Sequence, residues 1–254
     1  MLARLVAVGF SVGVLLIASG CRSGAAPASS PEMSPPERIF SPLPEEKHLG
    51  DIRMLTDGGE NAEAYFSYNG RKLTFQSTRP PYGCDQIFTM KTDGTGLKLV
   101  STGKGRTTCS YFLPGDKRIL YASTHKAADA CPAPADMSKG YVWKIYPEFD
   151  IFTANADGSD VIPLTNTPGY DAEATISAKG DRIVFTSTRD GDLDLYSMKL
   201  DGTDVRRLTD ALGYDGGAFF SPDGQKIVFR AQHPTDPKEV EDYKALLAQD
   251  LVRP

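Results

Sequence analysis

The sequence predicts an all-β protein built from repeated four-stranded antiparallel sheets, and three observations indicate it. A motif of strand, tight turn and strand occurs four times, as "YFSYNGRKLTF" at 65–75, "YFLPGDKRILY" at 111–121, "TISAKGDRIVF" at 175–185 and "FFSPDGQKIVF" at 219–229. The turn positions lie 46, 64 and 44 residues apart, at Gly70, Asp116, Gly180 and Gly224. The same three spacings recur further along each copy, at Arg79, His125, Arg189 and His233. The repeat is therefore about 44 residues long, with about twenty extra residues in the second copy.

Each full copy contains four short strands. In the third copy "ATIS" precedes a turn, and "RIVFTS", "DLYSMK" and "DVRRLT" follow it. Alternating and β-branched residues favour strands, and the Gly and Asp-Gly positions between them favour turns. One such sheet cannot bury both of its faces alone, so neighbouring sheets must stack around an axis. We therefore predict a β-propeller of four-stranded antiparallel blades, with about four blades recognisable and the last one incomplete.

The segments that flank the repeats differ from them. "DIRMLT" at 51–56 matches the fourth strand of a blade, which predicts a strand that closes the propeller. The fourth copy stops after its first hairpin, and "TDPKEVEDYKALLAQDL" then predicts a helix over 236–249. Thr235 or Asp236 would cap this helix, and Pro237 suits its first turn. Because the last blade lacks strands, we expect a C-terminally shortened chain or an unusual closure.

The first residues have the character of an export signal. Arg4 precedes an apolar run over 5–17, and "ASGC" then ends at Cys21. This pattern resembles the lipobox of bacterial lipoproteins, in which the cysteine carries the lipid. We predict a signal peptide at 1–20, lipidation at Cys21, an Ala-, Ser- and Pro-rich tether at 21–47 and the propeller region at 48–254. An ordinary cleaved signal and a short membrane helix are the alternatives.

Composition and motifs narrow the class of function. A net charge of −5 leaves no basic excess to neutralise phosphates, so nucleic acid is not an expected partner. "GFSVG" at 9–13 is the only G-x-S-x-G pattern, and it lies inside the predicted signal peptide. "DGTGLK" lacks the spacing and the lysine of a phosphate-binding loop. We therefore expect a binding protein without a cofactor and not an enzyme.

Three stretches carry a resemblance to a known family. "FFSPDGQKIVF", "TSTRDGDLDLYSMKLDGTDVRRLTD" and "TANADGSDVIPLTN" are similar to the WD-repeat-like blades of TolB-type β-propellers. The resemblance runs from about Leu49 to His233 and does not include the small α/β domain that precedes the propeller in TolB. It implies an exported binding or scaffold module that faces the periplasm and has an envelope protein as its partner. Lipidated Cys21 would attach it to the membrane, which is the outer membrane in a Gram-negative cell.

Long irregular segments gather on one predicted face of the propeller. The loops between second and third strands lie there, including the insertion at 126–147 and the helix after the fourth hairpin. Long loops on a rigid scaffold commonly carry binding, so this face is the candidate ligand-binding site. Its candidate residues are Arg79, His125, Arg189, His233, Glu63, Asp171, Glu173, Asp215, Tyr141, Trp143 and Tyr146.

The charged candidates have two interpretations. They form a charged ring at the mouth of the channel, or each arginine pairs with a carboxylate of its own repeat. His125 and His233 with Asp171 or Glu173 would supply too few ligands for a metal, so no metal site is predicted. "TRDGDLDLY" at 188–196 lacks the length and the final Glu of an EF-hand calcium loop.

The repeats also resemble those of a second class of propeller protein. Some oligogalacturonate lyases have propellers of similar repeats with a metal and histidines in the funnel. The alternative is therefore a metal-assisted enzyme or a receptor for acidic saccharides. In that case the carboxylates of the saccharide would be read by Arg79, Arg189, His125 and His233.

Cysteines and aromatic residues also map to the candidate face. Cys84, Cys109 and Cys131 would face an oxidising compartment, and we expect one disulfide, between Cys109 and either Cys84 or Cys131. "YVWKIYP" at 141–147 contains the sole tryptophan. These aromatic side chains either bind a partner or a sugar, or fold the insertion onto the propeller.

Overall fold

A computed structural model of the chain describes residues 38–254. The predicted signal peptide, Cys21 and the first part of the predicted tether lie outside the described residues. Within residues 38–254, no helix has the length and apolar character that crossing a membrane requires.

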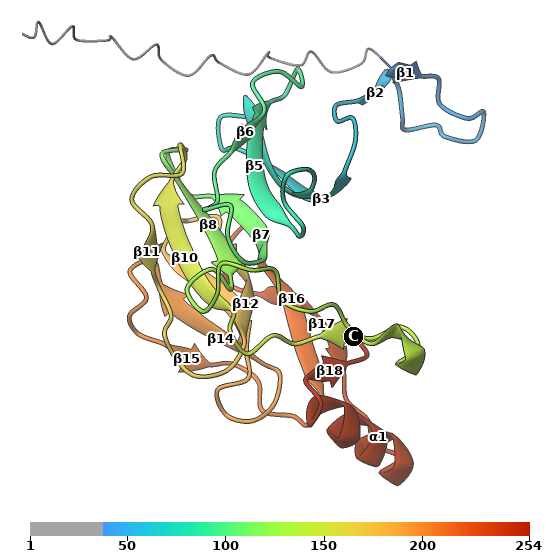
Figure 1. Ribbon diagram of the computed structural model, residues 1–254, viewed down its shortest axis with the longest axis vertical. Helices are drawn as coiled ribbons and strands as arrows, with labels where there is room; N and C mark the ends of the chain where they lie inside the picture. The colour runs from blue at the N-terminus through green and yellow to red at the C-terminus, as the bar shows by residue number, and fades with distance from the viewer. Residues whose placement is uncertain (1–37) are drawn as a thin grey trace, which may run out of the picture. The chain divides into compact units, whose positions relative to one another are not determined.

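Three complete blades follow one another along the chain (Figure 1). The first consists of β3 (Glu60–Phe66), β4 (Lys72–Thr78), β5 (Gln86–Lys91) and β6 (Lys98–Leu99). The second consists of β7 (Thr107–Phe112), β8 (Arg118–Ser123), β10 (Asp150–Asn155) and β11 (Ile162–Pro163). The third consists of β12 (Asp171–Ile176), β13 (Arg182–Ser187), β14 (Asp194–Lys199) and β15 (Arg206–Arg207). Every neighbouring pair is antiparallel and in chain order, which confirms the predicted four-stranded blades.

The fourth blade is incomplete, as predicted. β16 (Tyr214–Phe220) pairs with β17 (Ile227–Gln232), and the helix α1 (Pro237–Leu247) follows in place of a third strand. Asp236 caps α1, because its side chain accepts hydrogen bonds from the backbone amides of the next turn. The helix ends at residue 247, two positions before the predicted end.

The described residues before the first blade form a separate two-stranded sheet. β1 (Arg38–Phe40) pairs antiparallel with β2 (Ile52–Met54). The expectation that 51–56 would close the propeller is therefore wrong for the described residues, because β2 takes β1 as its partner. β1 also lies inside the segment predicted as a tether. The apolar pair Ile39 and Phe40 interrupts the Pro-rich composition there and suits a strand.

The core consists of layers between successive blades, because each sheet buries a face against the next sheet. Buried apolar residues fill each interface between blades. The first blade also has a cluster of its own, which consists of Leu73, Phe75, Phe88 and Met90. Representative residues are Ile87, Phe112 and Tyr121 between the first two blades, Leu120, Ile151 and Phe185 between the second and third, and Val184, Leu195 and Ala218 between the third and fourth.

Every inner strand contains a β-bulge at the same repeat position. The registers shift after Ala62, Thr108, Ala172 and Gly216. One residue further on, φ is positive, at 53° for Glu63, 52° for Cys109, 54° for Glu173 and 59° for Gly217. A bulge inserts one residue and turns its side chain away from the regular alternation of the strand. The four equivalent bulge residues therefore share an orientation within their blades.

The insertion and the C-terminal segment meet in a substructure that we call the cap, residues 126–147 and 236–254. The insertion contains a 3₁₀ turn, η1 (Met137–Lys139), and β9 (Trp143–Lys144). β18 (Leu251–Val252) pairs antiparallel with β9, so the last strand of the chain joins the insertion of the second blade. Side chains from both segments pack in shared apolar clusters, among them Val142, Tyr146, Tyr243, Leu246, Leu251 and Val252.

Candidate functional site

A cavity of about 670 Å³ lies where the inner strands meet the cap. All four bulge residues line it, namely Glu63, Cys109, Glu173 and Gly217. The cap contributes Trp143 and other residues of the insertion. Small-molecule and side-chain pockets in proteins have volumes of about 300–1,000 Å³, so this cavity has the size of a ligand site.

Aromatic rings from three blades gather on the cavity wall. Tyr65, Tyr111 and Phe219 occupy one repeat position, two residues after the bulge residue. The ring centroids of Tyr65 and Tyr111 are 4.2 Å apart, and Phe219 lies 6.3 Å from the first and 6.0 Å from the second. The third blade has Thr175 there, and its hydroxyl donates to the Ala218 carbonyl at 2.5 Å. Equivalent positions of the repeat thus build one continuous wall.

The carboxylate of Glu173 is held by donors from two blades. It accepts hydrogen bonds from the Thr186 hydroxyl at 2.8 Å, the Gly217 amide at 2.8 Å and the Tyr214 hydroxyl at 3.2 Å. Burial raises the pKa of Glu173, and these hydrogen bonds act in the opposite direction. Glu63 accepts from the Tyr65 hydroxyl at 2.6 Å.

The double glycine in "YDGGA" explains how the fourth blade approaches Glu173. A Cβ at Gly216 would collide with the Tyr214 hydroxyl and with the Glu173 carboxylate. Gly217 has open space around the position of a Cβ, and its amide points at Glu173. Glycine at 216 therefore makes room for the hydrogen bond between Tyr214 and Glu173.

The cationic side chains at the cavity wall have partners of their own. Lys144 lies 3.2 Å from the Asp250 carboxylate, and Arg106 lies 4.0 Å from Asp85. The guanidinium of Arg230 lies over the Trp143 ring, 5.9 Å from its centroid, and donates to an oxygen of Pro254.

Two of the predicted Arg and His residues pair with carboxylates of their own blades. Arg189 pairs with Asp171 at 2.9 Å, and His233 Nε2 lies 2.8 Å from Asp215 Oδ1. The second interpretation of the charged residues predicts such a pair for each arginine, and among residues 38–254 Arg189 forms it and Arg79 does not.

The two remaining candidates of this series use neutral partners. Arg79 donates to the side-chain oxygen of Asn61 at 2.7 Å, and His125 Nδ1 lies 2.8 Å from the Ser123 hydroxyl. Neither Arg79 nor His125 lines the cavity, and neither do Arg189, His233, Asp171 and Asp215. The structure therefore brings Glu63, Glu173, Trp143 and Tyr146 of the predicted set to one cavity.

The aromatic residues of the insertion have different positions. Tyr146 is buried in a cluster with Ala122 and Ala172 of the second and third blades, so this side chain folds the insertion onto the blades. Its hydroxyl donates to the Ala133 carbonyl, within the insertion, at 2.8 Å. Trp143 lines the cavity, packs edge-on against Tyr214 and donates from Nε1 to the Tyr141 hydroxyl at 3.0 Å. Tyr141 itself is 66% exposed.

The residues of the aromatic wall were not among those predicted for the site. Tyr65, Tyr111 and Phe219 each open the repeated hairpin motif, and the pattern alone does not separate a cavity position from a core position. The signal that could have found them is the run of aromatic residues at one repeat position in three of four copies.

The disulfide differs from the expected one. Cys84 and Cys131 are bonded, and among the described cysteines Cys109 is free, so both predicted pairings were wrong. The reason is the bulge, which directs Cys109 into the cavity, whereas Cys84 lies in the β4–β5 loop beside the insertion. Burial raises the pKa of the Cys109 thiol to about 12, so the group stays protonated.

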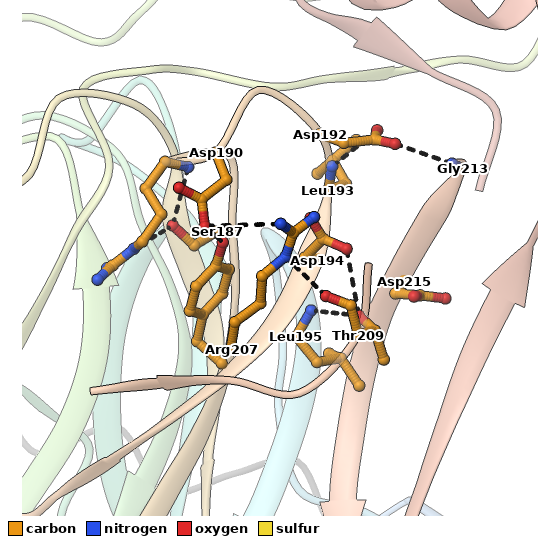
Figure 2. A network of polar contacts seen from close by, with 12 residues as sticks. Ser187, Asp190, Asp192, Leu193, Asp194, Leu195, Arg207, Thr209, Gly213 and Asp215 are labelled. Atoms are coloured by element: carbon orange, nitrogen blue, oxygen red, sulfur yellow. Dashed lines mark hydrogen bonds and ion pairs between the residues drawn. The ribbon is translucent and has the colours of Figure 1, made fainter. Parts of the chain in front are cut away.

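The Asp-rich turn at 188–196 forms hydrogen bonds within the protein (Figure 2). Asp192 accepts from the amides of Leu193 and Gly213, and Asp194 binds Arg207 at 2.6 Å. Among residues 38–254, no group of three or more His, Cys, Asp or Glu side chains has an arrangement that could hold a metal ion.

Comparisons with known proteins support the fold. A family model described as the TolB beta propeller domain matches residues 143–244. A putative TolB from Agrobacterium tumefaciens superposes with a TM-score of 0.52 at 22% identity, over 67% of this chain and 54% of that chain. TolB from Acinetobacter baumannii gives 0.51 at 20% identity, over 68% and 38%. A chain of a nidogen/laminin complex gives 0.52 at 12% identity, over 68% and 57%. No curated protein matches the chain in sequence.

These findings define the class of protein. The blades and their neighbours in structure make the chain a β-propeller protein, and residues 143–244 are similar to the TolB beta propeller domain. The chain spans 38–57% of the length of these three solved structures.

Proposed function

We propose that this TolB-like propeller is a lipid-anchored, exported binding module that holds part of an envelope protein, or another extracytoplasmic ligand, in its central cavity. The observation that carries the proposal is the convergence of equivalent bulge residues from successive blades on one cavity. Rigid strands position these side chains, and the cap covers them with an aromatic residue. Ligand sites combine such an apolar wall with a few polar groups in fixed positions.

The lining favours binding over covalent chemistry. Cys109 is a poor nucleophile, because its pKa of about 12 keeps the thiol protonated at neutral pH. The carboxylate of Glu173 is held by three donors, which orient it as a fixed acceptor. An acidic saccharide has less support as the ligand, because Arg189 and His233 already bind Asp171 and Asp215.

Export and lipidation are part of the same proposal. The bond between Cys84 and Cys131 fits an oxidising compartment such as the periplasm. Lipidation at Cys21 rests on the sequence pattern, and the proposed location is the periplasm-facing side of an envelope membrane.

Narrowing the cavity tests the binding site. Gly217 lies on the lining with open space at its Cβ position, and its equivalents Glu63 and Glu173 have side chains at the same φ. Gly217→Trp should therefore fill the cavity without breaking the blade. Gly217→Ala is the matched control, since it has the same backbone constraint and leaves the cavity open.

The readout is retention of envelope proteins by the immobilised full chain, identified by mass spectrometry. We expect the wild type and Gly217→Ala to retain the same proteins and Gly217→Trp to lose them, with all three chains equally folded by circular dichroism. Equal retention by Gly217→Trp would contradict the assignment of the cavity as the binding site.

A further inference from the structure

Two carboxylates in the cavity lack a cationic partner. Glu63 accepts a hydrogen bond from a tyrosine hydroxyl, and Glu173 accepts from two hydroxyls and a backbone amide. Within residues 38–254, neither carboxylate forms an ion pair. Of the cations in the lining, Lys144 and Arg106 lie beside Asp250 and Asp85, and Arg230 donates to an oxygen of Pro254. Glu63 and Glu173 are therefore acceptors in the lining without an ion-pair partner among residues 38–254.

The two carboxylates influence the electrostatic potential in the same part of the cavity. Glu63 and Glu173 are equivalent bulge residues of the first and third blades, and Cys109 of the second blade lies at the equivalent position between them in the repeat. Burial raises the pKa of the Cys109 thiol, and the charges of Glu173 and Glu63 both add to this effect. Both glutamates therefore lie within electrostatic reach of the middle of the inner wall.

Aromatic rings surround the two carboxylates. Tyr65, Tyr111 and Phe219 form one part of the wall. Trp143 with Tyr214 forms another, where the Arg230 guanidinium already lies 5.9 Å from the centre of the Trp143 ring. The faces of such rings attract cations that lie within about 6 Å of the ring centre. Carboxylates and aromatic faces together stabilise an organic cation that has lost its hydration shell.

We propose that the cavity binds an alkylammonium group, either of a free amine or of a lysine side chain in a partner. An ammonium has three donors and no acceptor, which suits two carboxylates that still have free acceptor positions. Among residues 38–254, the Oε1 atom of Glu173 accepts a single hydrogen bond, the 3.2 Å bond from Tyr214. The alkyl stem would lie along the aromatic wall. This proposal rests on the proposed function, because it names the ligand chemistry of the same cavity.

Trp143 provides the readout, because it is the only tryptophan of the chain and it lines the cavity. The full chain is titrated with n-butylammonium and with a Gly-Lys-Gly peptide blocked at both ends, while Trp143 fluorescence is recorded. The matched neutral and anionic probes are n-butanol and butyrate. We expect saturable binding of a cationic probe and binding of n-butanol and butyrate that is at least about tenfold weaker.

Two glutamine variants assign the effect to the carboxylates. Glu63→Gln should weaken binding of the cationic probe about tenfold or more, because it removes one charge and keeps the side-chain shape. Glu60→Gln is the control, since Glu60 is exposed on the same strand outside the cavity lining, and it should bind as the wild type does. Glu173→Gln is a second variant, whose folding is checked by circular dichroism.

The outcomes separate this inference from the proposed function. Binding of butylammonium supports a free amine as the ligand, and binding of the lysine peptide alone supports a side chain of a protein partner. Absence of a response to both cations, equal binding of n-butanol, or an unchanged affinity in Glu63→Gln would overturn the ammonium assignment. Loss of envelope partners in Gly217→Trp together with any of these results would leave the cavity as the binding site and reject only the ligand chemistry.

Discussion

The guanidinium of Arg189 donates from Nη2 to both carboxylate oxygens of Asp171, at 2.9 and 3.1 Å. Asp171 begins the inner strand of the third blade with a side chain that is 1% exposed, and Arg189 follows the second strand. The same guanidinium lies over the rings of Phe185 and Tyr196, at 5.2 and 4.9 Å from their centroids. This pair stabilises the blade at the end nearest the cap, and neither of its two residues lines the cavity.

Arg189→Ala should lower the free energy of unfolding by about 3 kcal/mol, because it leaves a buried carboxylate without its cation. Urea denaturation measures the change. The matched control is Arg206→Ala, whose guanidinium is exposed and pairs with Asp204. That variant should stay within about 0.5 kcal/mol of the wild type. Equal effects of the two substitutions would mean that the Arg189 pair acts as an ordinary surface ion pair.

The disulfide between Cys84 and Cys131 should stabilise the cap. It closes a segment with a sequence separation of 47 residues. Cys131→Ser should therefore lower the free energy of unfolding by about 2–4 kcal/mol. Peptide mapping without reductant should yield a linked pair that contains Cys84 and Cys131, with Cys109 in a separate, unlinked peptide. A linked peptide that contains Cys109 would refute this pairing.

The aspartates of the Asp-Gly turns should stabilise the fold less as the pH becomes acidic. Hydrogen bonds from the hydroxyl and the amide of Thr203 lower the pKa of Asp201 in the third blade. A carboxyl with a lowered folded-state pKa stabilises the fold above its unfolded pKa of about 3.9, and this stabilisation is lost as the pH falls through the folded pKa. Thr203→Val removes the hydroxyl donor, so an NMR titration should show the pKa of Asp201 rising. No rise would show that the hydroxyl has no influence on the carboxyl.

Lipidation at Cys21 is tested in a Gram-negative host by metabolic labelling with an alkyne fatty acid. The wild-type chain should incorporate the label and sediment with membranes. Cys21→Ser should lose both properties, because it removes the thiol that would carry the lipid. Cys109→Ser is the control for loss of a cysteine as such and should be labelled like the wild type. Labelling of Cys21→Ser would rule out this residue as the attachment site.

The propeller was predictable because its evidence is local and repeated. Strand, turn and strand recur at a constant spacing, and each copy has the composition of one sheet. The bulges were not predictable, since Glu63, Cys109, Glu173 and Gly217 share a positive φ but have no chemistry in common. Their conformation follows from the pairing of two strands and is not visible in any one residue type.

The cap and the cavity depend on contacts between distant segments. The pairing of β9 with β18 joins residues that are more than a hundred positions apart, and short strands of this kind have no periodic signal. The prediction that the insertion and the last helix share a face was sufficient to place Trp143 and Tyr146 near the site. It could not distinguish Cys131 from Cys109 as the partner of Cys84, because that choice depends on which loop the insertion crosses.

The most direct test of the account is site-specific photo-crosslinking of the full chain in cells. A photo-reactive phenylalanine analogue at Trp143, on the cavity wall, is compared with the same analogue at Tyr68, which is exposed in the β3–β4 turn outside the cavity lining. The account predicts a discrete adduct from position 143 that Gly217→Trp abolishes and Gly217→Ala preserves. Adducts from position 68 alone, or adducts from position 143 that persist in Gly217→Trp, would contradict the claim that the cavity is the binding site.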